Sequence, residues 1–265
     1  FSTYIRGIPY LWAFDGAFYS SPSYNDRLLF KHALERWGCQ QSYWFPLAPD
    51  FRITVPEQAS LGPLAPRAEA LKRGDVFFRE RDIDLIYVGG AYDSKIDRLA
   101  QLRRHFGSRF NIYGRWRLGG YGGFARWAKG KPPLWTRVRA VSNQERTQLY
   151  YRTKIGFNMH LSETPMETGN MRMYEVPAHG MMLLCDKAGL NAHEQIFKRD
   201  KEAVFYDSIE DAIEKIEYYL QHDEERERIA RAGFARVHRD YDWELGLKNF
   251  LDWASGLPKK KQVKP

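Results

Sequence analysis

The chain has 265 residues, of which 43% are hydrophobic, 15% aromatic and 28% charged. This composition supports a buried core and excludes a wholly disordered chain, a collagen and a coiled coil. The formal net charge is +8, and no apolar run approaches the roughly 20 residues that a membrane-spanning helix needs.

The two cysteines, Cys39 and Cys185, form neither a disulfide framework nor a metal-ligand spacing. That usage is typical of a reducing compartment, so we expect a cytoplasmic protein. The chain opens at Phe1 without an initiator Met or a signal-like stretch. We therefore expect that a preceding part was removed, processed or left out.

The positive charge is concentrated in two segments. Residues 259–264 hold four lysines in a Pro-ended tail that we expect to be solvated. Residues 103–154 hold thirteen Lys or Arg against the single acid Glu145, a net +12. Such a segment attracts phosphate on a nucleotide, a nucleic acid or a membrane surface; the alternative is a solvated basic face.

The first part of the chain predicts a strand, helix, strand unit. An apolar run over 8–14 is a strand that ends at Asp15, helical spacing predicts a helix over 25–37, and a second strand is expected over 42–47. Residues 49–66 are rich in Pro and Gly, which is typical of a connection between domains.

A second series of alternating strands and helices follows. Its strands are short apolar runs, predicted over 83–88, 110–113, 138–141, 155–160, 181–185 and 204–206. Its helices keep apolar residues at helical spacing, predicted over 94–106, 142–151, 170–178, 209–221, 223–238 and 243–253. Residues 116–135 give no periodic signal and are expected to form an irregular loop. Apolar rather than alternating strands predict an α/β fold with a parallel sheet covered on both faces.

Ligands of open parallel sheets bind beyond the carboxyl ends of the strands. The chain places several candidates at such ends, namely Gly89, Gly90, Gly114, Arg115 and His160. The glycine pair lacks the third glycine of a dinucleotide fingerprint, and a tight turn is the alternative. Lys95 lies in the first turn of the next helix, where it could meet a phosphate or remain solvated.

The most informative stretch opens the helix predicted over 170–178. Gly169 and Asn170 precede this helix, so backbone N–H groups there can hold a diphosphate. Glu167 is placed to face a sugar, while Glu175 is placed to accept hydrogen bonds from ribose hydroxyls. Arg172 is close enough to pair with Glu175 or to reach a phosphate. Ordinary surface acids and a helical ion pair are the alternative.

Two further side chains are candidates for proton transfer. His160 could orient a sugar or act as a base, or it could be a structural histidine. Asp15 could act as the base of an inverting transfer, or it could form an Asx-turn. No Asp-x-Asp pair is present where a metal-dependent transferase would hold its cation. We therefore expect no metal site and no cofactor.

The sequence also resembles a known family. Residues 151–160, 169–175 and 178–180 are similar to the carboxyl-terminal domain of the spore-maturation (CgeB-like) glycosyltransferases. Those enzymes are similar in turn to the large two-Rossmann-domain (GT-B) class of nucleotide-sugar glycosyltransferases. The resemblance extends over residues 80–250, and its most specific piece is the Asn-x-Arg-x-Tyr-Glu start of a helix.

The resemblance implies two Rossmann-like units that face a cleft, with the first one incomplete. Residues 1–66 would be the end of an acceptor-side domain plus a linker, 67–240 the nucleotide-sugar-binding domain, and 241–265 a terminal helix and basic tail. Several strands expected before Phe1 are missing.

The resemblance also implies a role for particular residues in the second domain. Glu175 would hold the ribose, residues 169–172 the diphosphate, and residues 138–141 would lie near the base. Gly89, Gly90 and Arg115 would line the same cleft. Glu167 and Glu175, separated by seven residues, correspond to a pair of glutamates in this class. The first glutamate of the pair varies among CgeB-like sequences, so the resemblance does not fix the role of Glu167.

We therefore expect a metal-independent glycosyltransferase that moves a sugar from a nucleotide diphosphate sugar to an acceptor hydroxyl. Aromatic residues interleaved with the basic residues of 103–154 make an anionic acceptor, such as a glycan or modified nucleic acid, a further hypothesis. The alternative from another class is a non-catalytic transferase scaffold or a nucleic-acid-binding subunit.

Overall fold

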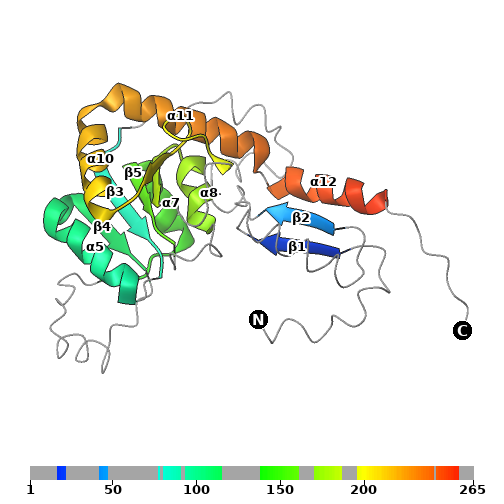
Figure 1. The fold of residues 1–265 in the computed structure, drawn as a ribbon, viewed down its shortest axis with the longest axis horizontal. Helices are drawn as coiled ribbons and strands as arrows, with labels where there is room; N and C mark the ends of the chain where they lie inside the picture. The colour runs from blue at the N-terminus through cyan, green and yellow to red at the C-terminus, as the bar shows by residue number, and fades with distance from the viewer. Residues whose placement is uncertain are drawn as a thin grey trace, which may run out of the picture.

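The computed structural model describes residues 17–21, 42–46, 77, 80–90, 93–114, 138–160, 170–186, 196–241 and 243–256 (Figure 1). These residues form a two-stranded sheet and a five-stranded sheet. The larger sheet carries the candidate site.

The larger sheet has five parallel strands in the order β4-β3-β5-β6-β7. They are β3 (Ile83–Val88), β4 (Phe110–Tyr113), β5 (Thr153–Asn158), β6 (Met182–Asp186) and β7 (Val204–Tyr206). The chain leaves β3 on one side to form β4 and returns on the other side to form β5. This reversal is the switch point beyond which open α/β sheets bind their ligands. The predicted α/β class with a parallel sheet is confirmed.

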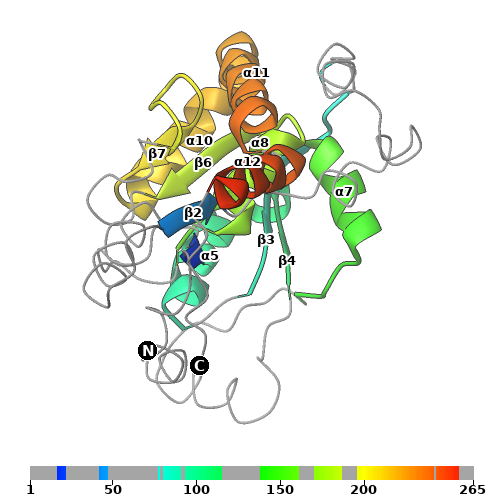
Figure 2. The same ribbon diagram turned by 90° about the vertical axis from the view of Figure 1, so that its right-hand side faces the viewer.

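Helices cover both faces of this sheet (Figures 1 and 2). One face carries α5 (Asp93–Phe106) and α10 (Ile209–Gln221). The other carries α7 (Asn143–Tyr151), α8 (Met171–Ala178) and α11 (Asp223–Asp240). A single 3-10 turn, η3 (Gly107–Arg109), joins α5 to β4.

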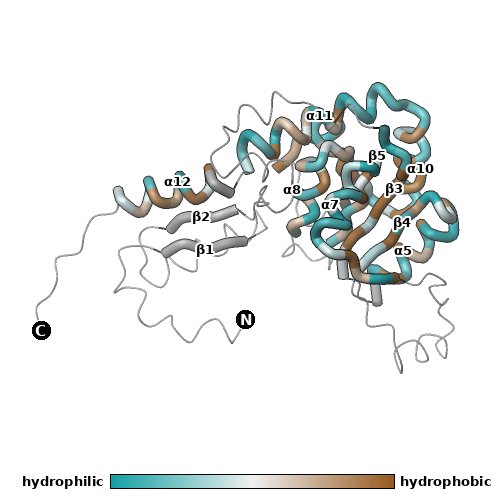
Figure 3. The backbone as a smooth tube through the Cα atoms, turned by 180° about the vertical axis from the view of Figure 1, so that it is seen from behind, coloured by the Kyte–Doolittle hydropathy of each residue, from teal (hydrophilic) through white to brown (hydrophobic). Residues whose placement is uncertain are grey.

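Alternate side chains of the strands enter two separate cores. Leu85 and Tyr87 of β3 pack with side chains of α5 and α10, whereas Ile86 packs with side chains of α7 and α8. Burying one such side chain stabilises the fold by about 1.5–3 kcal/mol relative to leaving it exposed. In Figure 3 the strands are therefore brown along much of their length, while the helices around them carry teal segments.

Local signals fix the ends of the helices on the α8 face. Ser142 caps α7, since its hydroxyl accepts a hydrogen bond from the N–H of Glu145 at 3.1 Å. Asn170 caps α8 through the N–H of Arg172, also at 3.1 Å. Gly180 follows α8 with a φ of 73°, a left-handed conformation that glycine adopts without strain.

The smaller sheet pairs β1 (Ala17–Ser21) with β2 (Ser42–Pro46) in parallel. The strand at β2 was predicted, whereas β1 was not. The last helix, α12 (Trp243–Ser255), follows α11 and lies against β2 (Figures 1 and 2). None of the helices in the described ranges is long and apolar enough to cross a membrane.

Two strand predictions need correction. The strand predicted over 138–141 is wrong. Among the described residues, this segment has one backbone bond to a strand end, from the N–H of Gly114 to the carbonyl of Arg139 at 2.9 Å, and it forms no ladder. The strand predicted over 155–160 begins two residues earlier, at Thr153, and ends at Asn158. Four further predictions lie outside the described residues: the strand over 8–14, the helix over 25–37, the connection over 49–66 and the loop over 116–135.

Candidate functional site

The candidate site lies at the switch point, where β3 and β5 end next to the beginning of α8. β3 is followed by Gly89 and Gly90, and β5 by Met159 and His160. The N–H of Gly89 donates to the carbonyl of Tyr113 at 2.9 Å, which also brings the end of β4 to this edge.

Arg172, in the first turn of α8, connects the two strand ends. Its Nε donates to the carbonyl oxygen of Val88 at 2.6 Å and its Nη1 to Oδ1 of Asn158 at 2.7 Å. Its guanidinium carbon lies 4.3 Å from the ring centroid of Tyr87, a cation–π distance. Within the described ranges these partners are neutral, so no carboxylate neutralises this half-buried positive charge. The alternative in which Arg172 pairs with Glu175 is therefore wrong.

The guanidinium of Arg172 lies close to the backbone of Gly89. A Cβ atom at residue 89 would overlap Nη2 of Arg172 and lie 3.0 Å from its Cζ. A Cβ at Gly90 would meet nothing within 4 Å, and the carbonyl of Gly90 accepts a hydrogen bond from the hydroxyl of Tyr87 at 2.8 Å. A side chain at residue 89 would therefore have to displace the guanidinium, whereas one at residue 90 would not.

Lys95 and Asn170 both hold the end of β5. The ammonium of Lys95 donates to the carbonyl of Met159 at 2.9 Å, and the amide of Asn170 donates to the same carbonyl at 3.5 Å. Lys95 is buried. Its charge therefore adds positive potential close to the end of β5. The alternative of a solvated Lys95 is wrong.

Glu175 lies one turn further along α8 and pairs with a residue that the sequence analysis missed. Its Oε1 is 3.3 Å from Nη2 of Arg146 on α7, and both side chains are largely buried. The main chain of Glu175 accepts a 2.6 Å hydrogen bond from Nδ1 of His179. The carboxylate is therefore held between two helices on the α7 and α8 face of the sheet.

His160 is held by Asp186, a second residue that the sequence analysis missed. The backbone N–H of His160 donates to Oδ2 of Asp186 at 2.9 Å, and Nδ1 of the ring donates to Oδ1 at 2.6 Å. A carboxylate only accepts, so Nδ1 carries the proton and Nε2 is the basic nitrogen of the neutral ring. Asp186 thus fixes the orientation of the ring, and the His160 side chain is fully buried.

His160, Cys185 and Asp186 offer ligand atoms that lie within 4.8 Å of one another, a grouping that could hold a metal ion. Their atoms are engaged within the protein, because His160 donates to Asp186 and the amide of Asn158 donates to the sulfur of Cys185 at 3.3 Å. Burial raises the pKa of the Cys185 thiol well above its ordinary value. The contacts of the three residues in the described structure are thus those of a hydrogen-bond network.

Gly114 follows β4, and its N–H donates a hydrogen bond to the carbonyl of Arg139. The other predicted site residues, Asp15, Arg115, Glu167 and Gly169, lie outside the described residues. The described candidates lie at the ends of β3, β4 and β5, in the first turn of α5, and at the cap and in the first two turns of α8: Gly89, Gly90, Gly114, Lys95, His160, Asn170, Arg172 and Glu175.

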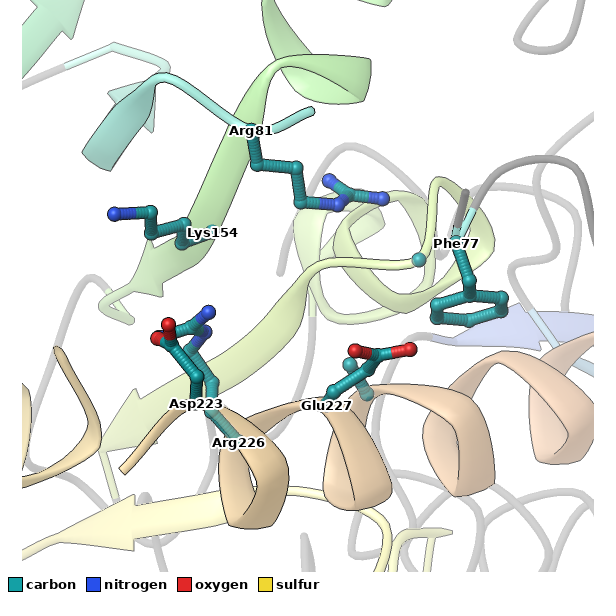
Figure 4. A pocket seen from close by; sticks show the side chains of 8 residues that line it. Phe77, Arg81, Lys154, Asp223, Arg226 and Glu227 are labelled. Atoms are coloured by element: carbon teal, nitrogen blue, oxygen red, sulfur yellow. The ribbon is translucent and has the colours of Figure 1, made fainter. Parts of the chain in front are cut away.

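A pocket of about 190 Å³ lies at the opposite edge of the sheet (Figure 4). Its lining residues are Phe77, Arg81, Lys154, Gly180, Asp223, Arg226, Glu227 and Ala230. Two of its cations bind main-chain carbonyls: Arg81 donates to His179 at 2.9 Å, and Arg226 to Tyr219 at 2.9 Å. These two arginines bind carbonyls near the ends of α8 and α10, which is a structural role for both side chains.

The comparison with protein families is decisive for the classification. The model of a family described as glycosyl transferase-like matches residues 96–252, more than half of the chain. The chain belongs to this family. The matched region of this glycosyl transferase-like chain includes β4 to β7 and all of the described site except the end of β3 and Lys95.

Solved structures show the same fold. The glycosyltransferase of Rickettsia africae ESF-5 matches at a TM-score of 0.59 and 13% identity, over 91% of this chain and 64% of that one. Anabaena Alr3699/HepE in complex with UDP-glucose matches at 0.56 and 13%, over 90% and 63%. TarM of S. aureus matches at 0.60 and 12%, over 95% and 45%.

These matches establish the architecture. The α/β fold is that of GT-B glycosyltransferases, and the chain spans less than two thirds of the length of these three structures. No curated protein matches the chain.

Proposed function

We propose that this chain binds a nucleoside diphosphate sugar at the carboxyl edge of its five-stranded sheet and transfers the sugar to an acceptor hydroxyl. The observation that carries the proposal is the charge of Arg172. It lies at the switch point, half-buried, with neutral oxygens as its described partners. A guanidinium in that position favours an anionic ligand.

The start of α8 supports diphosphate binding. Backbone N–H groups at the beginning of a helix attract anions, and the helix dipole adds a partial positive charge there. With Arg172 in the same turn, this edge can stabilise a departing diphosphate without a bound cation. Gly169, directly before the cap residue Asn170, stays a predicted part of this subsite, as does Arg115.

Glu175 supports recognition of the ribose. One of its oxygens contacts Arg146, and a carboxylate has acceptor capacity for further hydrogen bonds from vicinal hydroxyls. Among the structural neighbours, Anabaena Alr3699/HepE was solved with UDP-glucose and with UDP and glucose. Those complexes support a uridine nucleotide as the first donor to test.

The catalytic assignments stay proposals. His160, oriented by Asp186, is the described candidate for proton transfer, while Asp15 and Glu167 are predictions outside the described residues. The same proposal includes the finer resemblance to CgeB-like enzymes and the three-domain division at 66 and 240. It also includes independence of metal ions and a cytoplasmic location. The buried thiol of Cys185 is compatible with a reducing compartment.

The hypothesis of an anionic acceptor receives less support. Basic residues of the 103–154 segment pair with acids in the described structure: Arg109 and Lys154 with Asp84, Arg139 with Glu145, Arg146 with Glu175, and Arg152 with Asp82. Much of the described charge is therefore compensated inside the fold. The basic residues of 115–137 lie outside the described residues, so binding of DNA or an acidic glycan stays a prediction.

The proposal is tested by calorimetric titration with UDP, GDP, ADP and CDP. The parent protein is expected to bind at least one of them. Replacing Glu175 by Ala is expected to weaken that binding by about 1.5–3 kcal/mol, because a charge-assisted hydrogen bond to ribose is lost. Glu217→Ala is the matched control, since Glu217 pairs with His105 on the opposite face of the sheet. Absence of binding to every nucleotide would contradict the proposal, and binding without sugar transfer would favour the scaffold alternative.

A further inference from the structure

Arg146 is the neighbour that defines the position of the Glu175 side chain. The distance between Nη2 of Arg146 and Oε1 of Glu175 is 3.3 Å, and the two side chains are 22% and 10% exposed. Within the described residues, Arg146 is the cation that contacts this carboxylate. Burying a carboxylate is costly unless such a partner compensates its charge.

The backbone that carries Arg146 is itself well fixed. Its N–H donates to the carbonyl of Ser142 at 2.9 Å, in the capped first turn of α7. At the other end of α7, the rings of Tyr150 and Tyr151 pack edge-on against His179, with centroids 5.1 and 5.3 Å away. The guanidinium of Arg146 is thus presented to Glu175 from an anchored helix.

Tyr150 adds an unsatisfied polar group beside this pair. Its hydroxyl is buried and has no hydrogen-bond partner among the described residues. Burial raises the pKa of Tyr150, and the negative charge of Glu175 raises it further, while the charges of Arg172 and Arg146 act in the opposite direction. The hydroxyl therefore lies within the field of the pair, in a cluster that has hydrogen-bonding capacity left over.

We propose that Arg146 is a positioning residue that sets the Glu175 carboxylate for the vicinal hydroxyls of a ribose. The inference rests on the proposed function and narrows the donor to a ribonucleoside diphosphate sugar over its 2′-deoxyribose counterpart. One carboxylate oxygen contacts Arg146, which restricts the orientation of the group in advance and leaves the other oxygen as an acceptor for the ribose. A carboxylate with no such partner would need to be ordered on binding, and part of the affinity would be lost.

The competing explanation is an ion pair that joins α7 to α8 and has no contact with a ligand. Both explanations predict some loss of stability when Arg146 is replaced. They differ in selectivity, because only a positioned carboxylate senses whether the nucleotide carries its 2′-hydroxyl.

The test compares the nucleoside diphosphate that binds the parent protein with its 2′-deoxy form, for example UDP and dUDP, by calorimetric titration. The parent is expected to prefer the ribonucleotide by about tenfold. Arg146→Met is expected to reduce ribonucleotide affinity by about tenfold and deoxyribonucleotide affinity far less, so that the preference largely disappears. Arg146→Lys should restore part of it, and Arg146→Met combined with Glu175→Gln should lose little more than either change alone.

Arg152→Met is the matched control, because Arg152 caps the other end of the same helix, pairs with Asp82 and is exposed. Its ribose preference is expected to equal that of the parent. A folded Arg146→Met protein with an unchanged preference would overturn the inference and leave the proposed nucleotide site intact. A parent protein that binds no nucleotide would overturn both.

Discussion

The guanidinium of Arg172 occupies the space that a side chain at residue 89 would need. The contact joins the first turn of α8 to the end of β3, and the same guanidinium bonds to Asn158 at the end of β5. One side chain thereby holds the three elements that define the switch point. The glycine after β3 is consequently a packing requirement of the site.

Gly89→Ala is expected to displace the guanidinium of Arg172 and to destabilise the protein by about 1 kcal/mol, because this group is the end of a flexible side chain and the main loss is in its hydrogen bonds. Urea unfolding measures the effect. Gly90→Ala is the matched control and is expected to be tolerated, because its Cβ would meet nothing within 4 Å. In an Arg172→Ala background the Gly89→Ala change should cost much less, and strictly additive effects would show that the contact is not responsible.

Asp84 is expected to make stability depend on pH. Burial acts to raise its pKa, but hydrogen bonds from Lys154 and Arg109 outweigh this effect and hold the pKa below its ordinary value. The stabilisation is present above the unfolded pKa of about 3.9 and is lost as the pH falls through the lower folded pKa.

Asp84→Asn should therefore destabilise the protein near neutral pH by about 1 kcal/mol, a modest amount because solvent screens the pairs. The difference between the two proteins should vanish at acidic pH. Thermal unfolding of both proteins across a pH series checks this. A difference that stays constant into the acidic range would show that the ion pairs do not cause it.

Tyr174→Phe is expected to leave stability unchanged or to raise it by about 1 kcal/mol. The ring of Tyr174 packs against the rings of Phe197 and Tyr241, and its hydroxyl is buried with no hydrogen-bond partner in the described structure. Removing it relieves the cost of an unsatisfied group while the aromatic contacts remain. A loss of more than about 1 kcal/mol in urea unfolding would indicate a partner for this hydroxyl.

The secondary structure was predictable wherever local chemistry bounds an apolar run. β3 ends as predicted because Gly89-Gly90 follows Val88, and α8 begins as predicted because Asn170 is a strong cap. The segment 138–141 has the composition of a strand, but its one backbone bond to Gly114 does not make a ladder. Composition alone does not reveal whether an extended segment finds a neighbour.

The site was predictable only in part for a related reason. Asn170, Arg172 and Glu175 share one helix, so their spacing is readable in the sequence. Arg146 and Asp186 were missed because each acts on a residue of a different element, and such pairing follows from the packing of the sheet rather than from any local pattern.

The central claim is that a nucleoside diphosphate binds at the carboxyl edge of the five-stranded sheet, and hydrogen exchange with and without the nucleotide tests it most directly. The nucleotide found by titration should slow exchange in peptides that contain the end of β5 and the start of α8, residues 158–160 and 170–176. Peptides over 223–231, beside the pocket at the opposite edge, should exchange unchanged. Binding that leaves the start of α8 unprotected, or that protects only residues 223–231, would contradict the account.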